Sequence, residues 1–205
     1  MTDDNTIMRV ISNVHKMLIN RGYSADSINI SMSKKNKEAL IEKFRSGNNS
    51  LDIYINQSNF KKIYIHFIYS LNGAKLINEI EKLYNAISLG YNISSKDEIS
   101  IVIFEDFNND VLELENKYQN LTIFSYKKLV FNVVDHELVP KHIRLSPQEK
   151  SNLLNILMIE DYSKLPILQK TDTISRYYNY RKDDVIKVER PSMGNKTHIA
   201  YRYVD

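Results

Sequence analysis

Aromatic rings alternate with cations between residues 174 and 192, in the stretch ISRYYNYRKDDVIKVERPS. Rings stack on nucleic-acid bases and cations bind phosphates, so this pattern is typical of a protein that binds single-stranded nucleic acid. Tyrosine and arginine are also enriched where protein partners contact one another most strongly. The residue types alone fit both nucleic-acid binding and protein binding. The helices and strands on which these residues lie distinguish the two interpretations.

A second candidate for chemistry is Asp52, which lies at the start of an expected strand in SLDIYI. An aspartate there in a small α/β domain resembles restriction-endonuclease-like nucleases, which add a Glu-x-Lys tripeptide on a following strand to hold a divalent metal. The following strand, KKIYIHFI, lacks that tripeptide, and Glu105-Asp106-Phe107 contains no lysine. We therefore expect Asp52 to be a solvated or capping carboxylate, and we predict no catalytic residue.

The histidines do not form a metal-binding pattern. His136 and His142 are the closest pair, whereas a metal site needs three or four convergent ligands. The chain has no cysteine, and its five glycines form neither GxGxxG nor GxxxxGK[ST]. We therefore predict no metal, no cofactor and no small-molecule ligand.

Composition describes an ordinary globular protein. The 205 residues are 42% hydrophobic and 26% charged, which suggests one or two domains. The opening MTDDNTIMRVISNV lacks the basic and apolar regions of a signal peptide, and no uninterrupted apolar run could span a membrane. Residues 1–135 carry equal numbers of acidic and basic side chains, so the net charge of +3 lies in residues 136–205. We therefore expect at most weak DNA contact from the N-terminal part.

The N-terminal part has the pattern of a small α/β domain. Apolar residues at helical spacing predict a helix over 7–18, with Gly22 as a left-handed cap. The continuous apolar run at 99–104 is typical of a strand that is buried on both faces. Similar reasoning predicts helices at 34–44, 76–87 and 108–119 and strands at 51–55, 61–68, 121–126 and 129–134. This order favours parallel strand pairing.

A boundary near residues 135–145 divides the chain into domains 1–135 and 136–205. After it, Ser146-Pro147-Gln148-Glu149 has the pattern of a capping box, and Asp172 can cap a short helix through Tyr178. Strands are expected at 185–190 and 197–204. The second domain is therefore a small α+β domain, and at this size we expect it to depend on a partner.

Five sequence blocks of this second domain together resemble one family. The blocks are HELVPKH (136–142), LP (165–166), D-x-x-x-RYY (172–178), VIKVERPS (185–192) and YRYV (201–204). In this order they are similar to the fifth common subunit of eukaryotic-type RNA polymerases and to its archaeal counterparts. The first helix, followed by RGY at 21–23, looks like the jaw domain of the same family. The jaw fold resembles the nuclease fold without its active site, which agrees with the missing tripeptide.

The resemblance implies a non-catalytic subunit of a multisubunit DNA-dependent RNA polymerase. Its C-terminal domain would anchor to the largest subunit, and its N-terminal domain would form the lower jaw near downstream DNA during transcription, with weak or indirect DNA contact. Archaeal members lack the jaw, so a chain with both domains is eukaryote-like or viral. Its many Ile, Asn and Lys residues and its compact length look like those of a large cytoplasmic DNA virus. We expect host cytoplasm, the viral factory and the virion for a viral protein, and the nucleus otherwise.

The matching blocks also imply where the interface with the partner subunits lies. Residues expected there are His136, Glu137, Leu138, Val139, Pro140, His142, Arg176, Tyr177, Tyr178, Arg190, Pro191, Ser192, Tyr201 and Arg202.

Three positions depart from the family pattern. A Thr-Pro-Ser-Ala-like segment of the family is replaced by DFNND at 106–110, whose two acids would repel phosphate. Asn179 and Asp183 stand where the family has glycine. Because asparagine and aspartate tolerate positive φ better than other side chains, we expect both residues to keep a left-handed backbone.

A free-standing nucleic-acid-binding or nuclease-like protein is the alternative, and it predicts binding that weakens steeply with salt. Against it, a helix from Asp172 places Tyr177 and Tyr178 on neighbouring helical positions, where they cannot line one groove together. Nearby acidic residues also offset the local positive charge. We therefore predict a helix-turn-strand unit whose rings complete a small core, with Arg176 and Arg190 fixing contacts.

Overall fold

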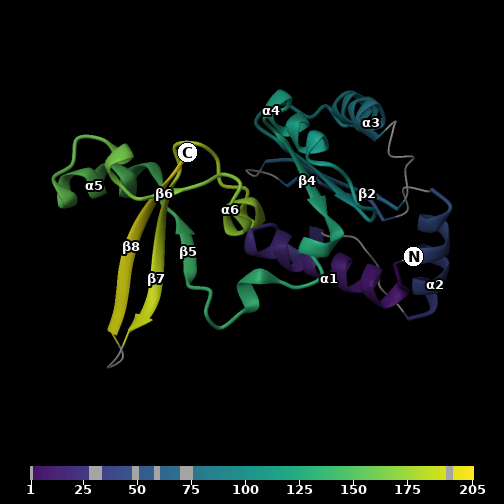
Figure 1. Ribbon diagram of the computed structural model, residues 1–205, viewed down its shortest axis with the longest axis horizontal. Helices are drawn as coiled ribbons and strands as arrows, with labels where there is room; N and C mark the ends of the chain where they lie inside the picture. The colour runs from purple at the N-terminus through teal and green to yellow at the C-terminus, as the bar shows by residue number, and fades with distance from the viewer. Residues whose placement is uncertain (1, 28–33, 48–50, 58–60, 70–75, 193–195) are drawn as a thin grey trace. The chain divides into compact units, whose positions relative to one another are not determined.

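The computed structural model describes residues 2–27, 34–47, 51–57, 61–69, 76–192 and 196–205. The chain forms two compact units, Met1–Phe131 and Asn132–Asp205, each with its own sheet (Figure 1). Each unit combines helices and strands, so the predicted mixed α/β fold class is confirmed.

The N-terminal unit is built on a four-stranded sheet in the order β1-β2-β3-β4. Its strands are β1 (Ile53–Ile55), β2 (Ile63–Ile68), β3 (Glu98–Ile103) and β4 (Leu121–Ser125). β1 pairs antiparallel with β2, while β2–β3 and β3–β4 are parallel. The predicted parallel pairing is therefore confirmed for the three strands that alternate with helices.

Helices cover both faces of this sheet (Figure 1). They are α1 (Asp4–Asn20), α2 (Lys34–Arg45), α3 (Leu76–Gly90) and the short α4 (Leu114–Lys117), which continues a 3-10 turn. α3 and α4 lie on one side of the sheet and α1 lies on the other (Figure 1). Every residue of β3 is buried, as a strand covered on both faces requires.

The segment predicted as a strand at 129–134 is not a strand, and this prediction was wrong. After β4 the chain turns through a 3-10 helix at Tyr126–Lys128, and a second 3-10 helix occupies Val133–Asp135. Asn13 of α1 donates from Nδ2 to the carbonyl oxygens of Leu129 and Val130, at 2.8 and 2.9 Å. These carbonyl groups are therefore bound by a distant helix instead of a neighbouring strand.

The RGY segment at residues 21–23, directly after α1, connects that helix to the sheet through side-chain contacts. Gly22 has φ +98°, so the predicted left-handed cap is confirmed. Arg21 forms a buried ion pair with Glu98, the first residue of β3, with Nη1 and Oε2 3.1 Å apart. The ring of Tyr23 is buried and its hydroxyl donates to the carbonyl oxygen of Lys61. Each residue of the segment thus has a structural role.

The C-terminal unit has a second four-stranded sheet, in the order β5-β7-β8-β6. Its strands are β5 (Lys141–Arg144), β6 (Ile167–Leu168), β7 (Val185–Ser192) and β8 (Lys196–Val204). β7 pairs antiparallel with both β5 and β8, and β6 is parallel to β8. The two long strands were predicted, whereas β5 and β6 were not.

Two capped helices complete this unit. α5 (Pro147–Leu157) begins with the predicted capping box, in which Ser146 and Glu149 each accept from the backbone N–H of the other. α6 (Thr173–Tyr178) begins at Asp172, whose carboxylate accepts from the N–H of Ile174 at 2.8 Å. Both predicted helix starts are therefore confirmed.

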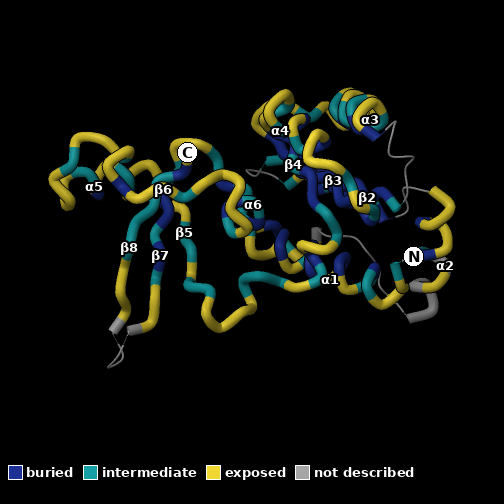
Figure 2. The backbone as a smooth tube through the Cα atoms, viewed as in Figure 1, coloured by how far each residue is buried: buried dark blue, intermediate teal, exposed yellow. Residues whose placement is uncertain are grey.

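The apolar interior of the C-terminal unit is small and divided. One cluster joins α5 to the sheet through Leu145, Leu153, Leu165 and Val185. A second cluster contains Tyr180, Ile186, Val188 and Val204, and side chains of α6 pack against it. Buried positions lie toward the start of β7, and the hairpin end of β7 and β8 is exposed (Figure 2). No helix in the described parts of the chain combines the length and apolar character that crossing a bilayer requires.

Candidate assembly surface

Asp52 is a buried structural anchor, and the expectation of a solvated or capping carboxylate was wrong. Its side chain is 9% exposed. The carboxylate accepts from the Tyr64 hydroxyl at 2.8 Å and from the Phe67 N–H at 3.3 Å, and His66 Nδ1 lies 2.7 Å away. Burial, together with the bond to this carboxylate, raises the pKa of Tyr64. Asp52 therefore fastens the chain before β1 to side chains and backbone of β2.

This arrangement differs from a nuclease site in what its oxygen atoms do. Metal-assisted hydrolysis needs carboxylate oxygens that point into an accessible site and hold the ion together. Both oxygens of Asp52 already accept hydrogen bonds from its own unit. Within the described ranges, no three Asp, Glu or His side chains converge on one point. The donor set at Asp52 thus fits a polar core contact and does not fit a metal centre.

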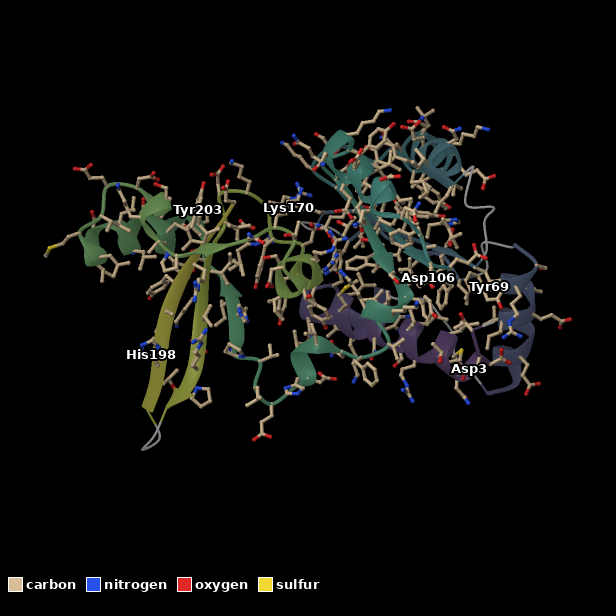
Figure 3. The ribbon with its side chains drawn as sticks, viewed as in Figure 1. Asp3, Tyr69, Asp106, Lys170, His198 and Tyr203 are labelled. Atoms are coloured by element: carbon tan, nitrogen blue, oxygen red, sulfur yellow. The ribbon has the colours of Figure 1, made fainter. Side chains whose placement is uncertain are left out.

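The acidic segment at 106–110 is partly neutralised. Asp106, which is labelled in Figure 3, forms an ion pair with Lys127, with Oδ1 and Nζ 2.6 Å apart, and both side chains are exposed. The expected repulsion of phosphate by this segment is therefore reduced by a neighbouring lysine that follows β4.

The interface residues expected from the first block lie on an exposed segment that leads into β5. His136, Glu137 and Leu138 are exposed, and the Leu138 side chain is 83% exposed. Val139 and Pro140 are half-buried. The His136 Nδ1 accepts from the N–H of Leu138, which fixes a local turn. An apolar side chain is thus held out into solvent on a short ordered segment.

The aromatic residues around α6 serve mainly the interior. Tyr177 and Tyr180 are buried, and Tyr178 is half-buried. The rings of Tyr178 and Tyr180 stack with centroids 5.3 Å apart and an interplanar angle of 13°, while Tyr177 contacts Tyr178 edge to face. The prediction that some rings complete the core is confirmed, and these stacked faces are not open to nucleic-acid bases.

Arg144 of β5 binds the segment that follows α6, and sequence reasoning missed this residue. Its guanidinium lies over the Tyr180 ring, 5.2 Å from the centroid. Its Nε is 3.0 Å from Asp184 Oδ2, and Nη2 donates to the carbonyl oxygen of Asn179 at 2.8 Å. The only signal in the sequence was its place beside the matching block at 136–142. Its role becomes visible once β5 is known to be a strand.

Asn179 and Asp183 both have a left-handed backbone, as predicted. Asn179 follows α6 with φ +49° and ψ +51°, and Asp183 has φ +70°. The N–H of Asn179 donates to the carbonyl of Arg176, and the N–H of Tyr180 donates to that of Ser175. These bonds satisfy the carbonyl groups at the end of the helix, which is what a left-handed cap provides.

Substitutions at Asn179 test the cost of this cap. Replacing Asn179 with glycine is expected to change the unfolding free energy by less than about 0.5 kcal/mol, because glycine adopts positive φ freely. Replacing it with alanine is expected to lower stability by about 1 kcal/mol, because Cβ disfavours this conformation. Urea unfolding followed by circular dichroism measures both values, and an alanine variant as stable as the glycine variant would contradict the assignment.

The expected residues on β7 and β8 fall on opposite faces of the sheet. Tyr201 shares one face with Lys187, its Cα partner on β7. Arg202 and Arg190 lie on the other face, together with His142 of β5. Arg190 and Pro191 are exposed, Tyr201 and Arg202 are half-buried, and the Ser192 side chain lies outside the described part of the structure. The expected interface set is therefore spread over two faces and a loop.

His142 lies at the edge of this second face. Its Nδ1 donates to the carbonyl oxygen of Pro140 at 2.7 Å. Burial lowers the pKa of His142, and the nearby guanidinium groups of Arg190 and Arg202 lower it further against the opposing effects of the Pro140 bond and Asp172. Its neutral form is therefore favoured in the folded protein.

Comparison with known proteins gives a family for this unit. Residues 131–204 match the family model described as RNA polymerase Rpb5, C-terminal domain. The match covers the C-terminal unit, including both of its helices and all four of its strands.

Relatives extend the similarity to the whole chain. A DNA-directed RNA polymerase subunit 5-like protein from Arabidopsis thaliana is 28% identical over 218 aligned positions, covering 99% of this chain and 98% of the relative. The subunit RPABC1 of RNA polymerases I, II and III from Caenorhabditis elegans is 37% identical over 92 residues. That alignment covers 45% of this chain and 43% of the nematode protein. The Dictyostelium discoideum counterpart is 38% identical over 88 residues, or 43% of this chain and 44% of the relative.

The match of the C-terminal unit, together with these relatives, indicates a non-catalytic subunit of a DNA-directed RNA polymerase. The C-terminal unit is similar to the Rpb5 C-terminal domain. With the full-length relative, it supports an Rpb5-family subunit.

Proposed function

We propose that this chain anchors to the largest subunit of a multisubunit RNA polymerase and forms the lower jaw near downstream DNA. In this proposal residues 136–205 form the assembly domain and residues 1–135 form the jaw. The match of the C-terminal unit to the Rpb5 domain is the observation that carries the proposal. The small, divided interior of that unit also favours a partner, because so small a core is only marginally stable by itself.

The jaw assignment rests on the N-terminal unit and on the equal numbers of acidic and basic side chains in residues 1–135. Its sheet, covered on both faces, resembles a nuclease fold whose carboxylate at Asp52 has become a core contact. A unit with balanced charge is suited to guiding DNA weakly within a larger complex and not to holding it alone. The expected interface residues, from His136 to Arg202, are part of the same proposal.

Affinity purification tests the proposed function directly. The tagged full chain, expressed in its own source, is expected to recover the largest polymerase subunit and the other subunits, identified by mass spectrometry. The purified chain alone is expected to bind DNA poorly and to show no magnesium-dependent cleavage. Recovery of no polymerase subunit would overturn the proposal and favour a free-standing nucleic-acid-binding protein.

The source and location of the protein form a separate part of the proposal. The relatives named above are eukaryotic subunits, and one is assigned to RNA polymerases I, II and III, which favours the nucleus. The abundance of Ile, Asn and Lys and the compact two-domain chain favour a viral homologue such as that of African swine fever virus, which would work in the host cytoplasm and be packaged in the virion. Fractionation of cells that express the protein from its native locus separates the two locations.

A further inference from the structure

One face of the C-terminal sheet carries arginine or histidine side chains from three strands. Cα partners on antiparallel strands project to the same face, as do alternate residues along one strand. Arg190 is the partner of His198, and Arg202, the partner of Ile186, is four residue pairs further along the same hairpin and therefore on the same face. His142 of β5 joins them because its partner, Val188, is two residues from Arg190. We call His142, Arg190, His198 and Arg202 the guanidinium face; His198 is labelled on β8 in Figure 3.

On the opposite face of the same strands, the lysines have an acidic partner. Glu189 lies between two of them, with carboxylate oxygens 2.7 Å from Lys187 Nζ and 3.9 Å from Lys141 Nζ. Arg144, which shares the guanidinium face, is paired with Asp184, whereas neither the Arg190 nor the Arg202 guanidinium has an ion pair or hydrogen bond with any residue that the structure describes. The same hairpin therefore balances the charge on one face and leaves it unbalanced on the other.

The two unpaired arginines give this face a positive charge. An external anion would complement that charge. Arg190 is exposed and Arg202 is half-buried over a floor that includes the buried Val188 and the half-buried Ala200. A half-buried arginine packs its stem and presents its guanidinium outward. The face thus offers two positioned donor groups above an apolar floor.

Protein carboxylates fit this face better than nucleic acid does. An arginine fork binds a carboxylate through two parallel hydrogen bonds. A nucleic-acid surface would add several further cations and open aromatic rings. Here the nearest rings, those of Tyr178 and Tyr180, stack on each other.

We propose that the guanidinium face docks an acidic segment of another polymerase subunit, with at least one Asp or Glu bound by each of Arg190 and Arg202. This inference rests on the proposed function, and it specifies the chemistry of the partner at that surface. Two carboxylates of one acidic segment would each use one guanidinium fork.

Paired substitutions on the two faces test the inference. The tagged full chain carrying Arg190→Gln and Arg202→Gln is expected to recover at least about tenfold less of the other subunits than the wild type. The matched control carries Lys141→Gln and Lys187→Gln, which remove the same charge from the opposite face of the same sheet. The control is expected to recover subunits within about twofold of the wild type. Unchanged recovery by the arginine variant, or equal loss by both variants, would overturn the inference.

A second pair of variants identifies the occupant even if the glutamine variant folds poorly. Arg190→Lys and Arg202→Lys keep the charge and supply amines that a carbodiimide can couple to carboxylates. Coupling of these amines to Asp or Glu of another subunit is expected. Links confined to this chain, or release of the chain by nuclease treatment, would overturn the inference. Failure of the wild type to recover any polymerase subunit would instead refute the proposed function itself.

Discussion

Replacing Asp52 with alanine is expected to lower the unfolding free energy of the N-terminal unit by about 3–5 kcal/mol. The substitution leaves the Tyr64 hydroxyl, the His66 ring nitrogen and the Phe67 N–H without the carboxylate that they share. Each buried group without a partner costs free energy because folding has removed it from water. Urea unfolding followed by circular dichroism measures the loss.

Two further variants show whether the loss of stability in Asp52→Ala comes from its hydrogen bonds or from the removal of a charge. Asp52→Asn keeps one acceptor oxygen and is expected to give an intermediate loss. Asp106→Ala removes a carboxylate of the same unit that is exposed and paired only at the surface, and it is expected to leave the transition nearly unchanged. Equal stability of the two alanine variants would show that Asp52 does not anchor β2.

Replacing Arg21 with methionine is expected to destabilise the same unit by about 3–5 kcal/mol, because it leaves the buried carboxylate of Glu98 without its cationic partner. The side chains of Arg21 and Glu98 are 4% and 10% exposed. Methionine fills a similar volume, so the loss reports mainly the uncompensated carboxylate of Glu98. Thermal and urea unfolding of the full chain measure the effect.

A double variant shows whether charge is the cause. Arg21→Met combined with Glu98→Leu replaces the ion pair with two apolar side chains, and buried ion pairs are often replaced in this way at little cost. Most of the stability lost in the single variant is therefore expected to return. A double variant as unstable as the single one would show that Arg21 acts through packing and not through Glu98.

The sequence was most informative where the signal is local or the whole element is buried. The periodic apolar residues of α1, the continuous apolar run of β3 and the capping box at Ser146 each specify an element through near neighbours. Asp172 likewise marks the start of α6 by a hydrogen bond that spans two residues. Such features can be predicted without knowing the rest of the fold.

The elements that were missed or wrongly predicted depend on contacts with residues far away in the sequence. β5 and β6 are short edge strands that β7 and β8 define by pairing, and KHIR carries little apolar pattern of its own. The β-branched run at 129–134 has strand propensity, but the side chain of Asn13 in α1 donates hydrogen bonds to its first two carbonyl oxygens. Propensity is a weak guide wherever tertiary contacts use the backbone differently.

The candidate surface was predictable only in part. The sequence blocks indicated which residues matter to the second domain and that tyrosine rings would enter its core. The separation of Tyr201 from Arg202 follows from alternation along one predicted strand. The grouping of Arg190 with Arg202 and His142 depends on strand register, so it required the pairing of three strands. The position of Arg144 over Tyr180 likewise depends on β5 and α6 together.

The bonds from Asn13 to Leu129 and Val130 also decide where the N-terminal unit can be separated from the rest of the chain. A gene fragment that stops at Ser125, after the last strand, would leave the Asn13 amide of the first helix buried without its two acceptors. A fragment that runs through Phe131 keeps both acceptors inside the expressed piece. The usable cut therefore lies six residues beyond the end of the sheet, at a position that strand boundaries alone would not suggest.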